Sequence, residues 1–300
     1  MTVGPADMER IAALLAAAGL GGACAVVPLA GTGNRTFAVT GADFDVVVRL
    51  PGHDTAALVD RAAEARNAAL AAALGVAPGL IHIEANDGAM VMQRAQGSPV
   101  ADLSTAARHA ALARFGRSLA RLHAGPGFQG RMDPWQKIDA YLAGAGLHDG
   151  AGPAAFGALW PRIDGLRRRA FLDPARLAPC HVDPIPANAI DDGTRVLLVD
   201  WEYAAMSEPL WDLAYLCVEG DLTPNEEASL LGGYGDAAVT GQGLRDWKLV
   251  TRAVSAAWCM ARAVTGDAVM WRVEVANRLA ALAADLDDAA AAAGGLGEQR

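Results

Sequence analysis

Lysine is almost absent from this 300-residue sequence, in which Lys137 and Lys248 are the only two. A role that requires a permanent cation within the first hundred residues must therefore fall to arginine. The sequence also lacks a CxxC pair and a histidine cluster at metal-binding spacing, and its four cysteines lie far apart. These absences predict reduced cysteines, typical of the cytoplasm, and argue against a zinc site.

Positive charge is scarce as a whole, because the formal net charge is -9 and the pI is about 5.1. A chain without a basic excess has little with which to neutralise the phosphates of nucleic acid or of an anionic membrane surface. We therefore expect small-molecule partners and no nucleic acid. The sequence gives no indication of the oligomeric state.

Long hydrophobic runs are lacking too, and the uncharged stretch from Ile11 to Asn34 is the candidate worth testing as a signal peptide or membrane span. Glycines and Pro28 interrupt it, alanine outnumbers leucine, and the ten residues before it contain two acidic side chains and a single basic one. Each of these features is unusual for a targeting or membrane-spanning segment. We expect a cytoplasmic protein without membrane insertion.

What the sequence does have is enough apolar material, 53% of its residues, to bury a substantial core in one large domain or in two lobes. The first part shows helical spacing near residues 5–19 and again over 54–74. Short β-branched or aromatic runs indicate strands between and after these helices. The expected strands are 25–28, 36–39, 44–50, 80–83 and 89–93.

The pattern changes after Gly97-Ser98-Pro99 to long helices rich in alanine, leucine and arginine. These are expected near 102–124, 134–145 and 153–171, and helix is expected from residue 201 to about residue 293. One strand-like stretch, 179–190 followed by 196–200, interrupts them. The sequence thus predicts an α+β fold, with an N-terminal lobe over 1–95 and a mostly helical lobe over 96–300.

The strand-like stretch carries the strongest chemical pattern, His181-Val-Asp-Pro-Ile-Pro-Ala-Asn188, followed by a strand that ends at Asp200. A kinase catalytic loop has an aspartate that accepts the proton of the acceptor hydroxyl. An asparagine five residues later and an aspartate after the next strand bind magnesium. Asp183, Asn188 and Asp200 fit these positions. Each alone would be read as a turn or capping residue, whereas the three together predict phosphoryl transfer from ATP with Mg²⁺.

These residues also carry a resemblance, since 181–203 (HVDPIPANAIDDGTRVLLVDWEY) closely resembles the choline/ethanolamine kinase branch of the aminoglycoside phosphotransferase-like kinases. Further segments of the chain are similar to that family, namely 28–39, 46–52, 60–64, 119–123 and 210–214. The resemblance implies a two-lobed protein-kinase-like fold, with a small antiparallel-sheet lobe and a larger helical lobe. It further implies an enzyme that transfers phosphate to an alcohol group.

The nucleotide-binding residues that the resemblance implies lie in the first lobe. Gly31 and Gly33 belong to a loop that can approach phosphates closely, with Asn34 adding a side-chain contact. A simple hairpin turn is the alternative there. Arg49 stands in place of the usual strand lysine, so it is expected to bind the phosphates while Glu64 orients it. A surface location for this pair is the alternative.

The acceptor is expected to be a small cationic alcohol, because aromatic faces and carboxylates attract an ammonium group. Glu202, Tyr203, Glu219 and Trp258 occupy positions similar to the choline kinase pocket. For Trp258 and Tyr203, core packing is an equal alternative. Other aromatic residues nearby are expected to pack in the core. These are Trp201, Trp211 and Tyr215.

Four functions remain open on the sequence alone. Choline or ethanolamine kinase is the first, and thiamine kinase is the nearest alternative because thiamine is also a hydroxylated cation. An aminoglycoside-type phosphotransferase would be expected to have a denser acidic face after residue 220. A nucleotide-binding pseudokinase without catalysis is the fourth, and the intact set of Asp183, Asn188 and Asp200 argues against it.

Overall fold

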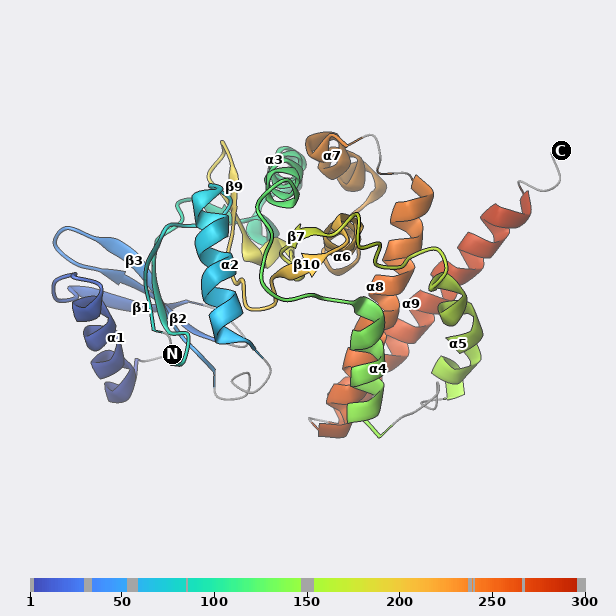
Figure 1. The fold of residues 1–300 in the computed structure, drawn as a ribbon, viewed down its shortest axis with the longest axis horizontal. Coiled ribbons are helices and arrows are strands. Elements are labelled where there is room, and N and C mark those ends of the chain that lie inside the picture. Colours follow the sequence, from blue (N-terminus) through green and yellow to red (C-terminus); the bar gives the residue numbers. More distant parts are fainter. Residues whose placement is uncertain are drawn as a thin grey trace. The chain divides into compact units, whose positions relative to one another are not determined.

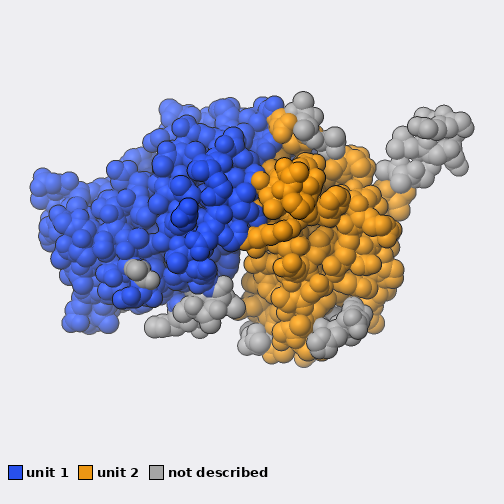
Figure 2. Space-filling model, in the orientation of Figure 1, with its two compact units in different colours: residues 1–130, 178–206, 223–235 blue, residues 131–177, 207–222, 236–300 orange. Residues whose placement is uncertain are grey.

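The computed structural model describes most of the chain. The described residues are 3–29, 34–52, 59–84, 86–146, 154–236, 239, 241–265 and 268–295. The chain divides into two compact units, which Figure 2 colours separately. Unit 1 comprises residues 1–130, 178–206 and 223–235, and unit 2 comprises 131–177, 207–222 and 236–300. The lobe boundary near residue 95 stays a prediction.

Unit 1 begins with helix α1 (Pro5–Ala17) and a five-stranded antiparallel sheet (Figure 1). The strands lie in the order β1-β2-β3-β5-β4. In chain order they are β1 (Ala25–Leu29), β2 (Arg35–Thr40), β3 (Asp45–Leu50), β4 (Leu80–Ile83) and β5 (Met90–Gln93). Each agrees with an expected strand to within a residue or two.

The alternation of side chains along β3 determines where Arg49 lies. Val46, Val48 and Leu50 belong to a hydrophobic core that they share with Ile11 and other apolar residues of α1. Successive side chains of a strand point to opposite faces of the sheet. Arg49 therefore lies on the face that α1 does not cover.

Helix α2 (Arg61–Ala73) is shorter than the expected helix over 54–74. Asp60 is the N-cap of α2, and its carboxylate accepts hydrogen bonds from two backbone amides in the first turn of this helix, at 3.1 and 3.0 Å. Such an N-cap satisfies amides that have no partner within the helix, so it fixes the helix start. Residues 54–58 of the expected helix lie outside the described residues.

The rest of unit 1 combines two helices with short strands. The elements are β6 (Ser98–Pro99), η1 (Val100–Asp102), α3 (Thr105–His123), β7 (Ala178–Cys180), η2 (Pro186–Asn188), β8 (Ala189–Asp191), β9 (Val196–Leu198) and α7 (Pro224–Tyr234). Only the two ends of the stretch 179–190 are strands. The prolines between them lack the amide hydrogen that a sheet ladder needs. Strands β6, β8 and β9 form one antiparallel sheet.

Helix α3 holds the β8–β9 hairpin in place through polar contacts. Arg114 forms two hydrogen bonds with the carboxylate of Asp191, at 2.6 and 2.7 Å. Ser118 donates to the carbonyl of Val196 at 2.6 Å. Paired guanidinium contacts of this kind restrict orientation as well as distance. The hairpin is therefore fixed at both of its strands.

Unit 2 is helical, and α8 packs against each of the other helices. The helices are α4 (Pro134–Gly144), α5 (Ala154–Leu166), α6 (Pro209–Glu219), α8 (Gly241–Thr265) and α9 (Ala268–Gly295). Trp211 is 2% exposed and stacks at 5.4 Å on Tyr215 within α6. The expected packing role of Trp211 agrees with this burial.

The expected α+β class is confirmed, with an antiparallel sheet followed by mostly helical structure. The expectation of helix alone after residue 200 was wrong, because β10 (Ala205–Ser207) pairs with β7. The sequence Ala-Met-Ser has little strand preference of its own, so tertiary pairing determines its conformation. No helix in the described part of the chain is both long and apolar enough to span a membrane.

Two glycines let α3 and α7 pack with their backbones in close approach. A Cβ atom at Gly233 would overlap the carbonyl of Ala113, and one at Gly116 would overlap the carbonyl of Leu230. At Gly232, the next residue of α7, a Cβ would meet no atom within 4 Å. Gly232 and Gly233 are therefore a matched pair of positions, one open and one in close contact, at which the effect of an added Cβ can be compared.

We predict that Gly233→Ala lowers the free energy of unfolding by about 2 kcal/mol, because overpacking against a helix backbone forces the helices apart. Gly232→Ala should instead raise it by up to about 1 kcal/mol through helix propensity. Chemical denaturation of the two variants measures both effects. Equal stability of the two variants would contradict the close approach of α3 and α7.

Candidate active site

The loop between β7 and β8 brings two of the predicted catalytic residues into contact. The amide nitrogen of Asn188 donates to the carbonyl of Asp183 at 3.1 Å and to its carboxylate at 3.3 Å. The backbone amide of Val199 donates to the carbonyl of Asn188 at 2.9 Å. These contacts connect the loop to the strand that precedes Asp200.

Buried aromatic residues and an unusual backbone hold the same loop. His181 is fully buried, donates from Nε2 to the carbonyl of Val199 at 2.9 Å, and lies 4.6 Å from the ring of Trp201. Val182 has a φ of 75° and Asp200 a φ of 66°. A β-branched residue in the left-handed region is strained, and such strain persists where the surroundings hold it. The buried His181 and Trp201 (4% exposed) are those surroundings, so Trp201 packs in the core as expected.

Arg49 lies at the centre of a network of charged side chains. Its Nη2 contacts Glu64 at 2.5 Å and the carbonyl of Gly88 at 3.3 Å, and its Nη1 contacts Asp200 at 3.4 Å. Arg49 is 4% exposed and Glu64 is 1% exposed. The structure thus rules out a surface location for this pair and connects it to the aspartate that follows β9.

Arg61 is a member of the network that the sequence analysis did not single out. Its Nη1 contacts Glu64 at 2.8 Å and Glu202 at 3.8 Å. The i,i+3 spacing of Arg61 and Glu64 on one helix is a signal that could have indicated the pair. Glu64 therefore lies between two arginines.

Asn34 and Glu202 are bonded to each other, although the sequence analysis gave them different roles. The amide of Asn34 donates to Glu202 at 3.1 Å, and its oxygen accepts from the backbone of Gly52 at 3.3 Å. The predicted phosphate contacts Gly31 and Gly33 lie outside the described residues. The hydrogen bond therefore connects Glu202 to the segment that was predicted to bind nucleotide.

The pKa of Asp200 is shifted by its surroundings in the network. Burial raises its pKa to about 6, nearby Glu202 adds to this effect, and Arg49 opposes it. Its side chain nevertheless retains 36% exposure. With all groups ionised, the network has two positive and three negative charges, counting Arg49, Arg61, Glu64, Asp200 and Glu202.

The donor set of the loop fits a hard divalent cation. Because the amide nitrogen of Asn188 faces Asp183, its amide oxygen is directed elsewhere. Asp200 adds a partly exposed carboxylate to a network with an excess of negative charge. Carboxylate and amide oxygens are the ligands that Mg²⁺ prefers.

The predicted acceptor residues belong to both units. In unit 1, Tyr203 is 36% exposed. In unit 2, Glu219 accepts a hydrogen bond from Ser255 at 2.5 Å and pairs with Arg278 at 2.6 Å. The positive charge of Arg278 therefore offsets the negative charge of Glu219. Burial lowers the pKa of Arg278, but the hydrogen bond and the negative charge of Glu219 act in the opposite direction, and the pKa is raised overall. This direction is consistent with a permanent ion pair.

Trp258 lines a cavity of about 560 Å³ between α8 and α9. Its ring stands at 90° to that of Trp271, with the centroids 5.0 Å apart. The remaining lining residues are Met270, Val273, Glu274 and Arg278. Trp271 was not anticipated, although its spacing of three and seven residues from Glu274 and Arg278 indicates one helical face.

The chain matches the family described as "Phosphotransferase enzyme family" over residues 25–249. A choline/ethanolamine kinase family protein from Mesorhizobium loti is 30% identical in sequence. The structural match has a TM-score of 0.78 and covers 93% of this chain and 94% of that one. The choline kinase LicA from Streptococcus pneumoniae is 21% identical, with a TM-score of 0.76 over 94% of this chain and 99% of the other.

A curated relative matches over a short segment. Protein LicA from Haemophilus influenzae is 36% identical over 58 residues, which are 19% of this chain and 22% of that protein. The chain thus aligns with about a fifth of the length of the curated relative, whereas the solved structures match almost throughout. The resemblance noted in the sequence is confirmed, and the chain belongs to the phosphotransferase enzyme family and, within it, to the choline/ethanolamine kinase family.

Proposed function

We propose that this protein is an ATP-dependent kinase that phosphorylates the hydroxyl of a small cationic alcohol, with choline or ethanolamine as the first candidates. The observation that carries the proposal is the contact of Asn188 with Asp183 on a loop tied to the strand before Asp200. Arg49, between Glu64 and Asp200, adds a cation next to the same strand end. The names of the similar solved structures support the choice of alcohol.

In the proposed reaction, the oxygen of the alcohol bonds to the γ-phosphorus of ATP, and the carboxylate of Asp183 accepts the proton that this oxygen loses. The bond between the γ-phosphorus and the bridging oxygen breaks, and ADP leaves. An aspartate can do this if its orientation is fixed, because general base catalysis depends first on geometry. The hydrogen bonds from Asn188 to Asp183 provide that orientation. His181, buried beneath the loop, braces it and takes no part in proton transfer.

Asn188 and Asp200 would hold Mg²⁺ through their side-chain oxygens. When bound, the ion offsets the negative charge that develops on the β- and γ-phosphates. The negative excess of the network around Asp200 is consistent with this requirement, because a nucleotide adds further negative charge. Arg49 would bind the phosphates, with Glu64 holding the guanidinium in orientation.

The ammonium group of the acceptor would bind at the perpendicular indoles of Trp258 and Trp271. Each ring presents a negative π-face to a cation. Glu219 contributes less field than an isolated carboxylate, because Arg278 is paired with it. Tyr203 and Glu202 remain proposed acceptor contacts from unit 1.

The proposal is tested by measuring ADP release from ATP and Mg²⁺ with choline, ethanolamine, thiamine, an aminoglycoside and homoserine in parallel. Preference for choline or ethanolamine supports it. Preference for thiamine or the aminoglycoside would keep the kinase assignment and change the acceptor. No ADP release with any alcohol would favour a pseudokinase.

We predict that Asp183→Asn lowers kcat at least about a thousandfold while ATP still binds, because the base is lost and the phosphate contacts remain. Asp192→Asn is a matched control, since Asp192 caps the nearby hairpin turn by accepting from Thr194 and Arg195. That variant should retain turnover. Comparable kcat for Asp183→Asn and the native protein would remove Asp183 from the proposed role.

Arg49→Ala should raise KM for ATP at least about tenfold, with a smaller change for the alcohol, because a charge-assisted phosphate contact is lost. Arg49→Lys should recover part of the effect, since lysine keeps the charge without the planar fork. Arg61 remains beside Glu64 at 2.8 Å and limits the cost of leaving that carboxylate buried. Thermal unfolding monitors this cost separately, and native ATP kinetics in both variants would place the phosphate contact elsewhere.

Trp258→Ala should raise KM for the alcohol roughly fivefold with little change for ATP, because a partly exposed cation-π contact contributes about 1 kcal/mol. Trp160 lies in the same unit, packed at 5.6 Å on Phe156, and Trp160→Ala is the control for a lost indole. Steady-state kinetics with each substrate varied in turn measures the difference. An unchanged acceptor KM in Trp258→Ala would contradict the proposed ammonium site.

A further inference from the structure

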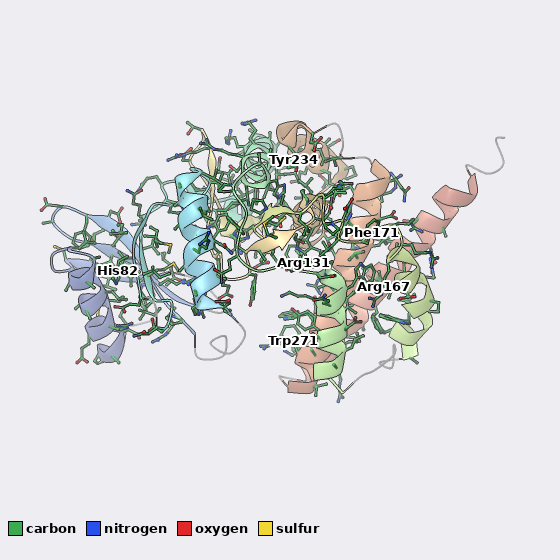
Figure 3. The ribbon with its side chains drawn as sticks, viewed as in Figure 1. His82, Arg131, Arg167, Phe171, Tyr234 and Trp271 are labelled. Atoms are coloured by element: carbon green, nitrogen blue, oxygen red, sulfur yellow. The ribbon has the colours of Figure 1, made fainter. Side chains whose placement is uncertain are left out.

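The two indoles that line the cavity of unit 2 already contact a cation of the protein itself. The guanidinium carbon of Arg262 lies 6.0 Å from the ring centroid of Trp258 and 5.7 Å from that of Trp271. Arg262 follows Trp258 by one helical turn on α8, and Trp271 lies near the start of α9 (Figure 3). One positive group therefore contacts both walls of the perpendicular pair.

Arg262 differs from Arg278, the arginine that lines the cavity, in how it is held. Arg278 pairs with Glu219 at 2.6 Å and with Glu274 at 2.8 Å, so two carboxylates fix its position. Arg262 is exposed, and among the described residues no carboxylate lies within ion-pair distance of it. The contacts that hold its guanidinium are those with the two indoles.

A guanidinium over an aromatic ring is attracted by the same π-electron charge that attracts a ligand ammonium group. The two cations repel each other at short distance, and one position over the rings cannot hold both. Binding of an ammonium ligand here therefore requires Arg262 to move away from the indoles. The free-energy cost of this movement is modest, because the Arg262 side chain is exposed and its movement breaks no ion pair with a described residue.

We propose that Arg262 is an internal competitor for the cation site, so that it sets how weakly this protein binds its cationic substrate. The inference rests on the proposed function for the identity of the site, since it assigns Trp258 and Trp271 to the ammonium group. It reverses the usual expectation for a residue of a binding pocket. Removal of Arg262 strengthens binding, whereas removal of Trp258 weakens it.

The simplest alternative is that Arg262 only covers apolar surface with its aliphatic stem, as long charged side chains often do. The indoles would then lose a packing partner when Arg262 is removed, and affinity for cations would stay the same or decrease. The two accounts differ in the sign of the effect. A binding measurement therefore distinguishes them.

The experiment titrates the full-length protein with choline and with tetramethylammonium, and determines Kd by calorimetry. The variants are Arg262→Ala and Arg262→Gln, the second of which keeps most of the side-chain length without charge. We expect both to lower Kd for either cation about two- to fivefold, the equivalent of one exposed cation-π contact. Arg272→Ala is the matched control, because Arg272 is an exposed arginine next to Trp271 on α9. It changes net charge equally and should leave Kd unchanged.

Equal or higher Kd in both Arg262 variants would overturn the inference, and so would an equal decrease in Arg272→Ala, which would indicate a general charge effect. Absence of measurable cation binding in every variant would overturn it as well. Tetramethylammonium has no hydroxyl, so its binding is independent of turnover. If no alcohol is phosphorylated, the proposed function fails, and the Kd values still decide the role of Arg262. If choline is phosphorylated and the Kd values do not change, only the inference about Arg262 fails.

Discussion

The buried pair of Arg49 and Glu64 is the interaction on which the site in unit 1 depends. Two charges removed from water are tolerated only when each has close partners, because an unpaired buried charge is strongly destabilising. Here Arg61 completes the environment of Glu64, and Asp200 faces Arg49. The sheet, helix α2 and the end of β9 thus meet at these charges, and their positions are mutually constrained.

Much of this arrangement could be predicted from the sequence, because the relevant signals are local. The alternation in β3 places Arg49 opposite the α1 core, and the five-residue spacing of Asp183 and Asn188 matches a known catalytic loop. Where a contact depends on residues close in the chain, or on a pattern shared by a family, sequence suffices.

The contacts that escaped prediction join residues distant in the chain. The bond between Asn34 and Glu202 spans 168 positions, and nothing at either residue indicates it. Strand β10 forms only because β7 is available for pairing. Arg278 neutralises Glu219 across 59 positions, which alters the electrostatics expected from a lone carboxylate. In each case tertiary structure, rather than local preference, determines the partner.

The way in which the chain alternates between its two units has a consequence for how such a protein can be divided or recombined. The backbone passes from one unit to the other five times, at residues 130, 177, 206, 222 and 235. Neither unit corresponds to a continuous segment, so no single cut separates one unit from the other. Ribosomal synthesis completes unit 1 only after most of the chain has emerged. Exchange of modules between relatives should therefore involve the entire chain, and domain fusions should occur at its termini.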